Sequence, residues 1–352
     1  GAAPTGSQLV NLGNAIAATG PNTWAAINNV RAASVSWTLP TSTALNAVDS
    51  AALESAAKTL MNSTTPSIAE NTGDTVTALA GAAKKLTLTY SLPLLAHACM
   101  EVMDCTVAIT KDAGGIVTGC EIWAPTQAPD GLAKTAAPLL GLDPTLAANM
   151  AKIKVNTTYM GGGLGRKIEN DTATQAVKVA LALNKPVKLI WPREEDFARD
   201  WFRPSALSRV IVGLDAAGKI VGWANRIVSP SLARSHGRVP AATGDGISIG
   251  GAVKLLYATG PRLVEYVEQL APNLQIGFWR SVGESISCFV VESAIDECAL
   301  AAGVDPLQYR LNLLGANTPV KNVLQAAATL GGWGTPLAAG DRKSTRLNSS
   351  HT

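Results

Sequence analysis

The stretch "YMGGGLGRK", residues 159–167, constrains the fold more than any other part of the sequence. Glycine loses more backbone freedom on folding than any other residue, so a run of it belongs where the backbone needs positive φ angles or a very close approach. Apolar alternation before the run predicts a strand over 152–159. A capping box at 172–175 predicts a buried helix after it, ending near Pro186.

The best-known glycine motifs do not fit this run. A dinucleotide fingerprint that started at Gly161 would need a glycine where Arg166 stands, and a P-loop would need Ser or Thr where Ile168 follows Lys167. Consecutive glycines can still form a nest of backbone N–H groups that binds an anion or an oxo group, helped by the two cations. The other interpretation is a tight turn packed against a neighbouring strand.

Composition narrows the function classes. The 352 residues are 47% hydrophobic and only 16% charged, with a formal net charge of +3. The last twelve residues, "DRKSTRLNSSHT", hold three cations and one carboxylate, so +2 of the +3, and +1 remains for the rest. That balance does not support a nucleic-acid or anionic membrane surface. No apolar run reaches the ~18 residues of a membrane span.

The same twelve residues have a foreign composition and resemble a translated sequencing adapter. We therefore exclude 341–352 from the fold, and we expect the natural chain to continue beyond Gly340. Five cysteines form no CxxC pair and fit no zinc or iron–sulfur spacing, so each is expected to be a small buried hydrophobe. They are Cys99, Cys105, Cys120, Cys288 and Cys298.

Local patterns predict an α+β fold with antiparallel strands interleaved with helices, without the βαβ rhythm of a doubly wound sheet. The predicted elements are a helix over 22–33, a strand over 34–39, a linker over 61–74, a strand around 86–90, hairpin turns at 112–115 and 215–218, and a helix that Gly303 closes. Asp305 and Pro306 are expected to begin a further helix as its cap and first residue.

Three more stretches place polar side chains at the ends of expected elements, where sites are usually built. They are "YSLPLLAHACMEVMDCT" at 90–106, "EIWAPTQAP" at 121–129 and "GFWRSVGES" at 277–285. With the glycine run, and in this order, they resemble the molybdenum-cofactor-binding large subunit of the molybdenum hydroxylases, the xanthine dehydrogenase/aldehyde oxidase family. The isoquinoline 1-oxidoreductase β-subunit type is the most similar branch.

The resemblance implies a domain organisation. Residues 1–62 would be the end of an N-terminal α/β, hammerhead-like domain, and 63–270 the first molybdenum-cofactor-binding domain. Residues 271–340 would begin a second such domain that the sequence cuts short. The expected fold is therefore α+β, with mixed and antiparallel sheets and helices.

The resemblance also implies roles for residues. Gln127 matches a glutamine whose amide bonds an oxo ligand of molybdenum, and Arg280 matches an arginine that lines the substrate pocket beside the cofactor and stabilises negative charge. The loop residues matched to cofactor binding are Gly162, Gly163, Leu164, Gly165 and Arg166. No protein ligand to molybdenum is expected, because dithiolene sulfurs of the pterin hold the metal. His97 and Glu101 are expected to be a buried, satisfied pair.

The sequence departs from the family's motifs at two places that bear on the expected reaction. Ile168 stands where the xanthine-oxidising branch has a substrate-binding glutamate, which argues against purine substrates. The family's catalytic base is a glutamate in a "GxGE" motif that this sequence does not contain. Glu284 in "SVGES" occupies a different position, so the role is not transferred to it. The chain as given is therefore expected to be inactive by itself.

The resemblance implies oxidative hydroxylation of an N-heteroaromatic compound or an aldehyde with water-derived oxygen. The expected cofactor is molybdopterin in its cytosine dinucleotide form. Expected partners are a small [2Fe–2S] subunit and, in part of this branch, a c-type cytochrome subunit. Periplasmic placement through twin-arginine export and cytoplasmic placement both stay open. The alternative is a non-catalytic, β-rich binding or structural domain whose glycine run is only a tight turn.

Overall fold

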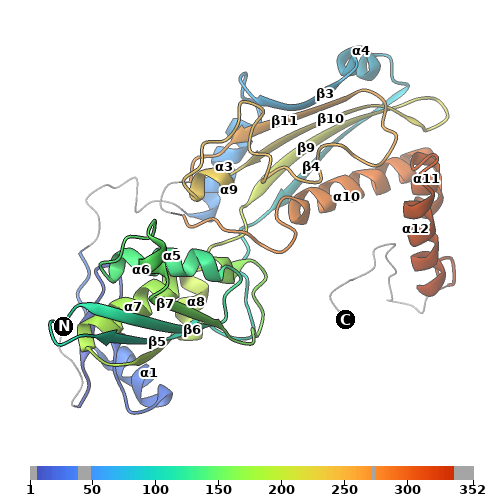
Figure 1. The fold of residues 1–352 in the computed structure, drawn as a ribbon. Coiled ribbons are helices and arrows are strands. Elements are labelled where there is room, and N and C mark those ends of the chain that lie inside the picture. Colours follow the sequence, from blue (N-terminus) through green and yellow to red (C-terminus); the bar gives the residue numbers. More distant parts are fainter. Residues whose placement is uncertain (1–5, 39–48, 272–273, 337–352) are drawn as a thin grey trace. The chain divides into compact units, whose positions relative to one another are not determined.

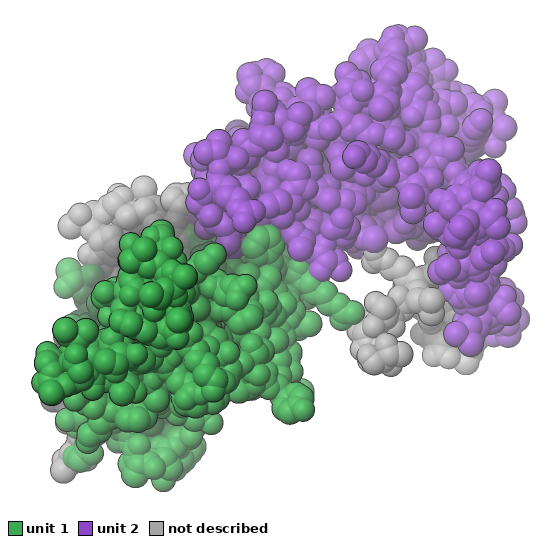
Figure 2. Space-filling view, viewed as in Figure 1, with its two compact units in different colours: residues 1–48, 94–203, 272–280 green, residues 49–93, 204–271, 281–352 purple. Residues whose placement is uncertain are grey.

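The computed structural model describes residues 6–38, 49–271 and 274–336, and these form two compact units (Figures 1 and 2). Unit 1 takes residues 1–48, 94–203 and 272–280, and unit 2 takes 49–93, 204–271 and 281–352. The units interleave along the chain, whereas the sequence predicted consecutive domains. The domain boundaries at 62 and 270 therefore stay predictions, and the foreign 341–352 lies outside the described residues.

Unit 1 is built on a four-stranded sheet of order β7-β6-β5-β8. Its strands are β5 (Asp104–Lys111), β6 (Val117–Ala124), β7 (Ile153–Thr157) and β8 (Val187–Ile190). The β5–β6 hairpin around 112–115 confirms the predicted turn, and β7 confirms the strand expected before the glycine run. Helices α5 (Pro129–Leu139) and α7 (Asp171–Leu183) contribute buried residues to the same core as β5 and β6 (Figure 1).

The remaining elements of unit 1 are short. They are β1 (Leu9–Asn11), β2 (Ile16–Ala18), α1 (Thr23–Ala32), α6 (Ala147–Met150), the 3₁₀ turn η1 (Arg166–Ile168) and α8 (Arg193–Ala198). Helix α1 confirms the prediction over 22–33, but 34–38 carries no strand, and residue 39 lies outside the described residues. The capping box was wrong. Helix α7 begins at Asp171, one residue before Thr172. The carboxylate of Asp171 lies at the N-terminal, positive end of the helix dipole and accepts a hydrogen bond from the guanidinium of Arg166.

Unit 2 is built on a five-stranded sheet of order β3-β11-β10-β9-β4. Its strands are β3 (Ser67–Thr72), β4 (Lys84–Leu92), β9 (Ala206–Leu214), β10 (Ile220–Ser229) and β11 (Arg262–Glu268). The β9–β10 hairpin and β4 confirm their predictions. The linker expected over 61–74 was wrong in its middle, because β3 pairs with β11 there, and an ion pair between Arg262 and Glu70 joins the two strands.

Helices accompany this sheet. They are α3 (Ser50–Leu60), α4 (Thr75–Ala80), α9 (Leu232–Ser235), α10 (Glu284–Ala302), α11 (Pro306–Leu313) and α12 (Thr318–Leu330). The largest core of unit 2 joins α10 to β9 and β10, with Trp223 and Ile295 fully buried in it. As predicted, Gly303 ends α10 with a φ of 68°, and Asp305 caps α11 ahead of Pro306.

The α+β prediction is confirmed, with antiparallel pairs and two parallel pairs, β6–β7 and β10–β11. The five cysteines are free, and four are buried as predicted, but Cys288 on α10 is exposed. Burial raises the pKa of Cys105 to about 12 and that of Cys120 to about 11, so both stay protonated. Within the described ranges, no helix has the length and apolar character that crossing a membrane requires.

Candidate functional site

The glycine loop, residues 158–165, leaves the end of β7 and enters η1. Gly162 and Gly165 have φ angles of 99° and 104°, a region that side chains strongly disfavour. Leu164 also has a positive φ, 53°, although it carries a side chain. Strain of this kind costs on the order of 1–3 kcal/mol and persists where the surroundings impose it. The loop is therefore held in one unusual conformation.

The surrounding protein explains the lack of side chains in the glycine loop. A Cβ atom on Gly161 would lie 2.5 Å from Cβ of Glu101, and one on Gly163 would lie 2.5 Å from Oε1 of Gln127. On Gly165 it would lie 1.5 Å from the carbonyl oxygen of Phe278. Close packing thus requires glycine at 161 and 165, whereas the neighbours of Gly163 are the ends of flexible side chains.

Three successive backbone donors of the loop stay unused. The N–H group of Gly161 donates to Glu101, and that of Gly165 donates to Gln127. Within the described part of the chain, the N–H groups of Gly162, Gly163 and Leu164 meet no hydrogen-bond acceptor. Consecutive free N–H groups on a backbone with positive φ angles form a concave site for an anion or an oxo group.

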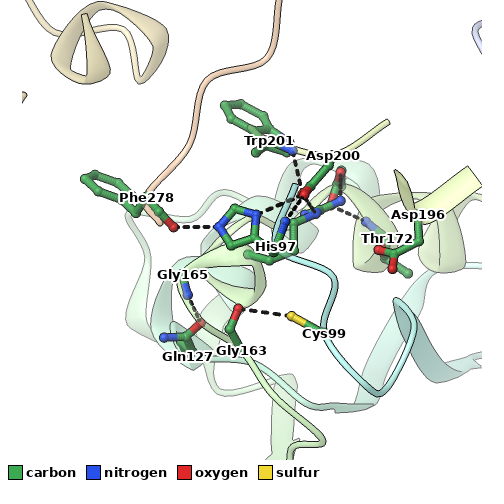
Figure 3. Close-up of polar contacts among 12 residues, drawn as sticks. His97, Cys99, Gln127, Gly163, Gly165, Thr172, Asp196, Asp200, Trp201 and Phe278 are labelled. Carbon is green, nitrogen blue, oxygen red and sulfur yellow. Dashed lines mark hydrogen bonds and ion pairs between the residues drawn. The ribbon is translucent and has the colours of Figure 1, made fainter. Parts of the chain in front are cut away.

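Gln127 follows the end of β6 and lies against this loop (Figure 3). Its main-chain N–H donates to the carbonyl of Lys167 at 2.8 Å, which fixes the backbone. Its side-chain Oε1 accepts the N–H of Gly165 at 3.0 Å. Because that N–H can only donate, the oxygen of the amide must face it, and the NH₂ group is left as the free donor. The side chain is exposed, so this donor is accessible to a ligand.

The charge of Arg166 does not contribute to the anion-binding site formed by the free N–H groups of the glycine loop. Its side chain is 1% exposed, and its two Nη atoms donate to Asp171 at 3.1 and 2.7 Å. Its Nε lies 2.9 Å from Oδ1 of Asp200, and its guanidinium lies over the ring of Trp191. Burial alone would lower the pKa of Arg166, but the two carboxylates raise it. The guanidinium therefore stays charged and links Asp171 to Asp200 inside unit 1.

Lys167 is used in the same way. It is buried and forms an ion pair with Glu101, whose carboxylate also accepts the N–H of Gly161 at 2.9 Å. Burial opposes ionisation of Glu101, but the bonds from Lys167 and Gly161 outweigh it and lower the pKa of that carboxyl. The expectation that both cations add charge to the nest was therefore wrong, since carboxylates balance each of them.

His97 and Glu101 do not form the expected pair. His97 is 4% exposed, and its Nδ1 lies 3.0 Å from Oδ1 of Asp200, while its Nε2 lies 2.8 Å from the carbonyl of Phe278 (Figure 3). The sequence analysis missed Asp200. A signal was present, because a buried arginine and histidine need a counter-charge, but "REEDFARD" at 193–200 is typical of a solvated helix.

Arg280 ends the segment 274–280, which belongs to unit 1. Its side chain is exposed, whereas the preceding Trp279 packs inward, with the guanidinium carbon of Arg203 5.9 Å from its ring centroid. Phe278 brings this segment onto Gly165, so unit 1 contains residues from all four motifs. Glu284 belongs to unit 2, where its carboxylate packs against Gly250.

The arrangement defines a class of site. It offers a backbone nest and an oriented amide donor, and the described residues hold no cluster of three or more His, Cys, Asp or Glu side chains that could bind a metal ion. The free N–H groups and the amide donor suit a ligand that presents oxygen atoms to the protein.

Comparison with known proteins agrees with this class. Residues 60–313 match the family described as the molybdopterin cofactor-binding domain. The chain belongs to that family, and within it to the molybdenum hydroxylases.

The similar curated proteins have different named substrates. The isoquinoline 1-oxidoreductase subunit beta of Brevundimonas diminuta is 28% identical over 220 residues, 60% of this chain and 27% of that protein. The aldehyde oxidoreductase molybdenum-binding subunit PaoC of Escherichia coli K12 is 29% identical over 249 residues, 69% of this chain and 30% of that protein. The chain thus spans less than a third of the length of either relative.

Solved structures show the same fold. The aldehyde oxidoreductase from Desulfovibrio desulfuricans matches with a TM-score of 0.57 at 18% identity, over 76% of this chain and 30% of that one. Quinoline 2-oxidoreductase from Pseudomonas putida matches with a TM-score of 0.53 at 17% identity, over 69% of this chain and 30% of that one.

Proposed function

We propose that this chain is part of the catalytic subunit of a molybdenum hydroxylase that hydroxylates an N-heteroaromatic compound or an aldehyde. The similar proteins support both substrate classes, since they are named for isoquinoline, aldehyde and, at 27% identity, nicotinate oxidation. The family resemblance places Ile168 where the purine-oxidising branch has a glutamate, and this disfavours purines as substrates.

The orientation of the Gln127 amide carries the proposal. Gly165 fixes its oxygen, so its NH₂ group is the donor that meets an oxo ligand of the cofactor. The free N–H groups of Gly162, Gly163 and Leu164 bind the same region of the cofactor. When bound, the molybdenum cofactor supplies the two-electron redox centre and the oxygen transfer.

The two arginines take different parts in this proposal. Arg166 is buried in ion pairs and its backbone N–H donates to the carbonyl of Gly163, so it serves the cofactor by holding the loop in place. Arg280 is exposed and close in sequence to the contact with Gly165, so its guanidinium is free to face a substrate. There it stabilises negative charge that develops on the substrate, an effect worth ~10²–10³ in kcat for one well-placed donor.

The partners and the form of the cofactor follow from the same proposal. Several relatives are named as single subunits of larger enzymes, which supports a complex. We expect a small [2Fe–2S] subunit to receive the electrons and the pterin to carry a cytosine dinucleotide. A c-type cytochrome subunit is the further partner that the resemblance predicts.

The alternative, a non-catalytic domain, is favoured by one observation. Gly161 and Gly165 are required by packing against protein atoms, which a tight turn without any ligand would also show. The free N–H groups and the free amide donor distinguish the two, because a turn that only packs has no need of them.

The test is activity of the assembled enzyme from its source, with an artificial electron acceptor and a panel of N-heteroaromatic compounds and aldehydes. We expect turnover within one of these classes, and a loss of ~10²–10³ in kcat for Arg280→Met with molybdenum content unchanged. A molybdenum-loaded enzyme that oxidises neither class would contradict the proposal.

A further inference from the structure

The segment that carries Arg280 is attached to unit 1 at defined points. The N–H of Phe202 donates to the carbonyl of Gln275 at 2.9 Å, and the N–H of Gly277 donates to the carbonyl of Phe202 at 3.0 Å. These bonds end at Gly277, three residues before Arg280. They fix the first part of 274–280 and leave the orientation of its end to other contacts.

The carbonyl of Phe278 is the next contact along this segment. Nε2 of His97 lies 2.8 Å from its oxygen. The same oxygen lies so close to Gly165 that a Cβ there would be 1.5 Å away. The peptide after Phe278 is therefore held between the glycine loop and the imidazole ring (Figure 3).

The other side of the ring faces a carboxylate. Nδ1 of His97 lies 3.0 and 3.1 Å from the two oxygens of Asp200. Asp200 also accepts the N–H of His97 at 2.5 Å and that of Trp201 at 2.8 Å, and Nε of Arg166 lies 2.9 Å away. Donors surround this carboxylate, so it serves as an acceptor toward the ring as well.

Both ring nitrogens of His97 thus meet acceptors. A neutral imidazole has one N–H and one lone pair, so it would leave a lone pair facing either Asp200 or the carbonyl of Phe278. The imidazolium form donates in both directions. Its charge is balanced locally, because Asp200 faces both His97 and Arg166, and Asp171 faces Arg166 from the other side.

We propose that His97 is a positioning residue whose imidazolium form fastens the Phe278 carbonyl to the glycine loop and thereby places Arg280 beside the cofactor site. The part that concerns Arg280 rests on the proposed function. The fastening itself is a property of the protein alone. His97 touches neither substrate nor cofactor in this proposal, and it acts through the main chain two residues ahead of Arg280.

The fastening is tested without any cofactor. Hydrogen exchange of the 352-residue chain should show the amide of Gly277, which donates to the carbonyl of Phe202 next to the held peptide, exchanging about tenfold faster in His97→Gln, since a charge-assisted bond is lost. The β5–β6 hairpin should keep its exchange rates. Equal acceleration in the hairpin would reveal general unfolding, and an unchanged rate at Gly277 would overturn the proposal.

A second measurement needs no variant. Nitrogen-15 NMR of the ring in the folded wild-type chain at pH 7 reports whether both nitrogens of His97 carry protons. Two protonated nitrogens are expected. A neutral ring in the folded chain would overturn the proposal even if His97→Gln failed to fold.

A double-mutant cycle in the assembled enzyme tests the link to Arg280. His97→Gln should lower kcat/KM about tenfold when Arg280 is present, and less than about twofold in an Arg280→Met background. Equal losses in both backgrounds would show a merely structural role. If the enzyme holds no molybdenum, the proposed function fails, while the exchange and NMR results still decide the fastening.

Discussion

Two regions of the molecule are stabilised in different ways: the apolar core around α10 in unit 2 and the surroundings of the glycine loop in unit 1. In unit 2, α10 packs Ile295, Cys298 and other apolar residues on the strands β9 and β10. Around the glycine loop of unit 1, the buried side chains are instead charged, with Arg166 and Lys167 each 1% exposed. The apolar core needs only shape and volume, whereas each buried charge needs a partner at a fixed distance.

This difference indicates which part of the molecule needs side chains in a fixed geometry. A buried ion pair is weak evidence for stability, because desolvation offsets most of the attraction. Its partners must nevertheless stay in one geometry, and here they hold the loop that presents Gly162 and Gln127. We infer that the buried charges around the glycine loop fix the site, while the apolar cores of the two units serve stability.

The largest effect is expected from Arg166→Met. The change removes the cation that pairs with both Asp171, whose side chain is 21% exposed, and the buried Asp200, and this should cost about 3–5 kcal/mol in the free energy of unfolding. This loss in the free energy of unfolding is measured by urea unfolding of unit 1, monitored by hydrogen exchange. The control is Arg31→Met, which removes an exposed ion pair with Glu194 and should cost less than about 1 kcal/mol. Similar losses for both variants would contradict the role given to the buried charges around the glycine loop.

Gly165→Ala should follow, at about 3 kcal/mol, because a Cβ would collide with the carbonyl of Phe278 and the φ of 104° disfavours alanine. Gly115→Ala is the matched control. That hairpin glycine has a φ of 83° but open space around it, so only the backbone cost of about 1–2 kcal/mol remains. The same unfolding assay applies, and equal costs would mean that close packing at Gly165 contributes nothing.

A smaller effect is expected in the apolar core. Ile295→Val removes one methylene from a fully buried site and should cost about 1 kcal/mol in the unfolding of unit 2. Differential scanning calorimetry, with hydrogen exchange to assign the transition, measures this. A loss as large as that of Arg166→Met would mean that the apolar core of unit 2 is as sensitive to substitution as the buried charges around the glycine loop. That result would contradict the comparison.

The smallest effect concerns pH. The pKa of Glu101 is lowered from its ordinary value of 4.5 in the folded chain, so its contribution to stability is present above pH 4.5 and is lost as the pH falls through the lowered value. Unfolding measured from pH 7 down to pH 3 should show this loss in the wild type. Glu101→Gln should lack that component, and identical pH profiles would contradict the assignment.

Local sequence signals predicted much of the fold. The turns at 112–115 and 215–218 were found because Asp and Gly favour the required backbone angles, and the end of α10 because Gly303 takes a positive φ. Strand β3 was missed because "SIAENT" is polar, and its pairing with β11 is a tertiary contact. Propensity cannot report a partner that lies far away in the chain.

The site was predictable to a similar degree. The motifs located Gln127 and the glycine loop, and the structure brings them into contact. The partners of the charges were not predictable, since Asp200 lies 103 residues from His97 in the sequence. The pairing expected between His97 and Glu101 failed for that reason, because sequence proximity was the only available guide.

The central claim is that the oriented amide of Gln127 holds the molybdenum cofactor. It is tested most directly by the molybdenum content of the assembled wild-type enzyme and of Gln127→Glu, measured under competition for the cofactor. The glutamate still accepts the N–H of Gly165 but lacks the NH₂ donor. We predict about one molybdenum per wild-type chain and an affinity about 10–100-fold weaker in the variant. A folded wild-type enzyme without molybdenum, or a variant that binds it equally well, would contradict the account.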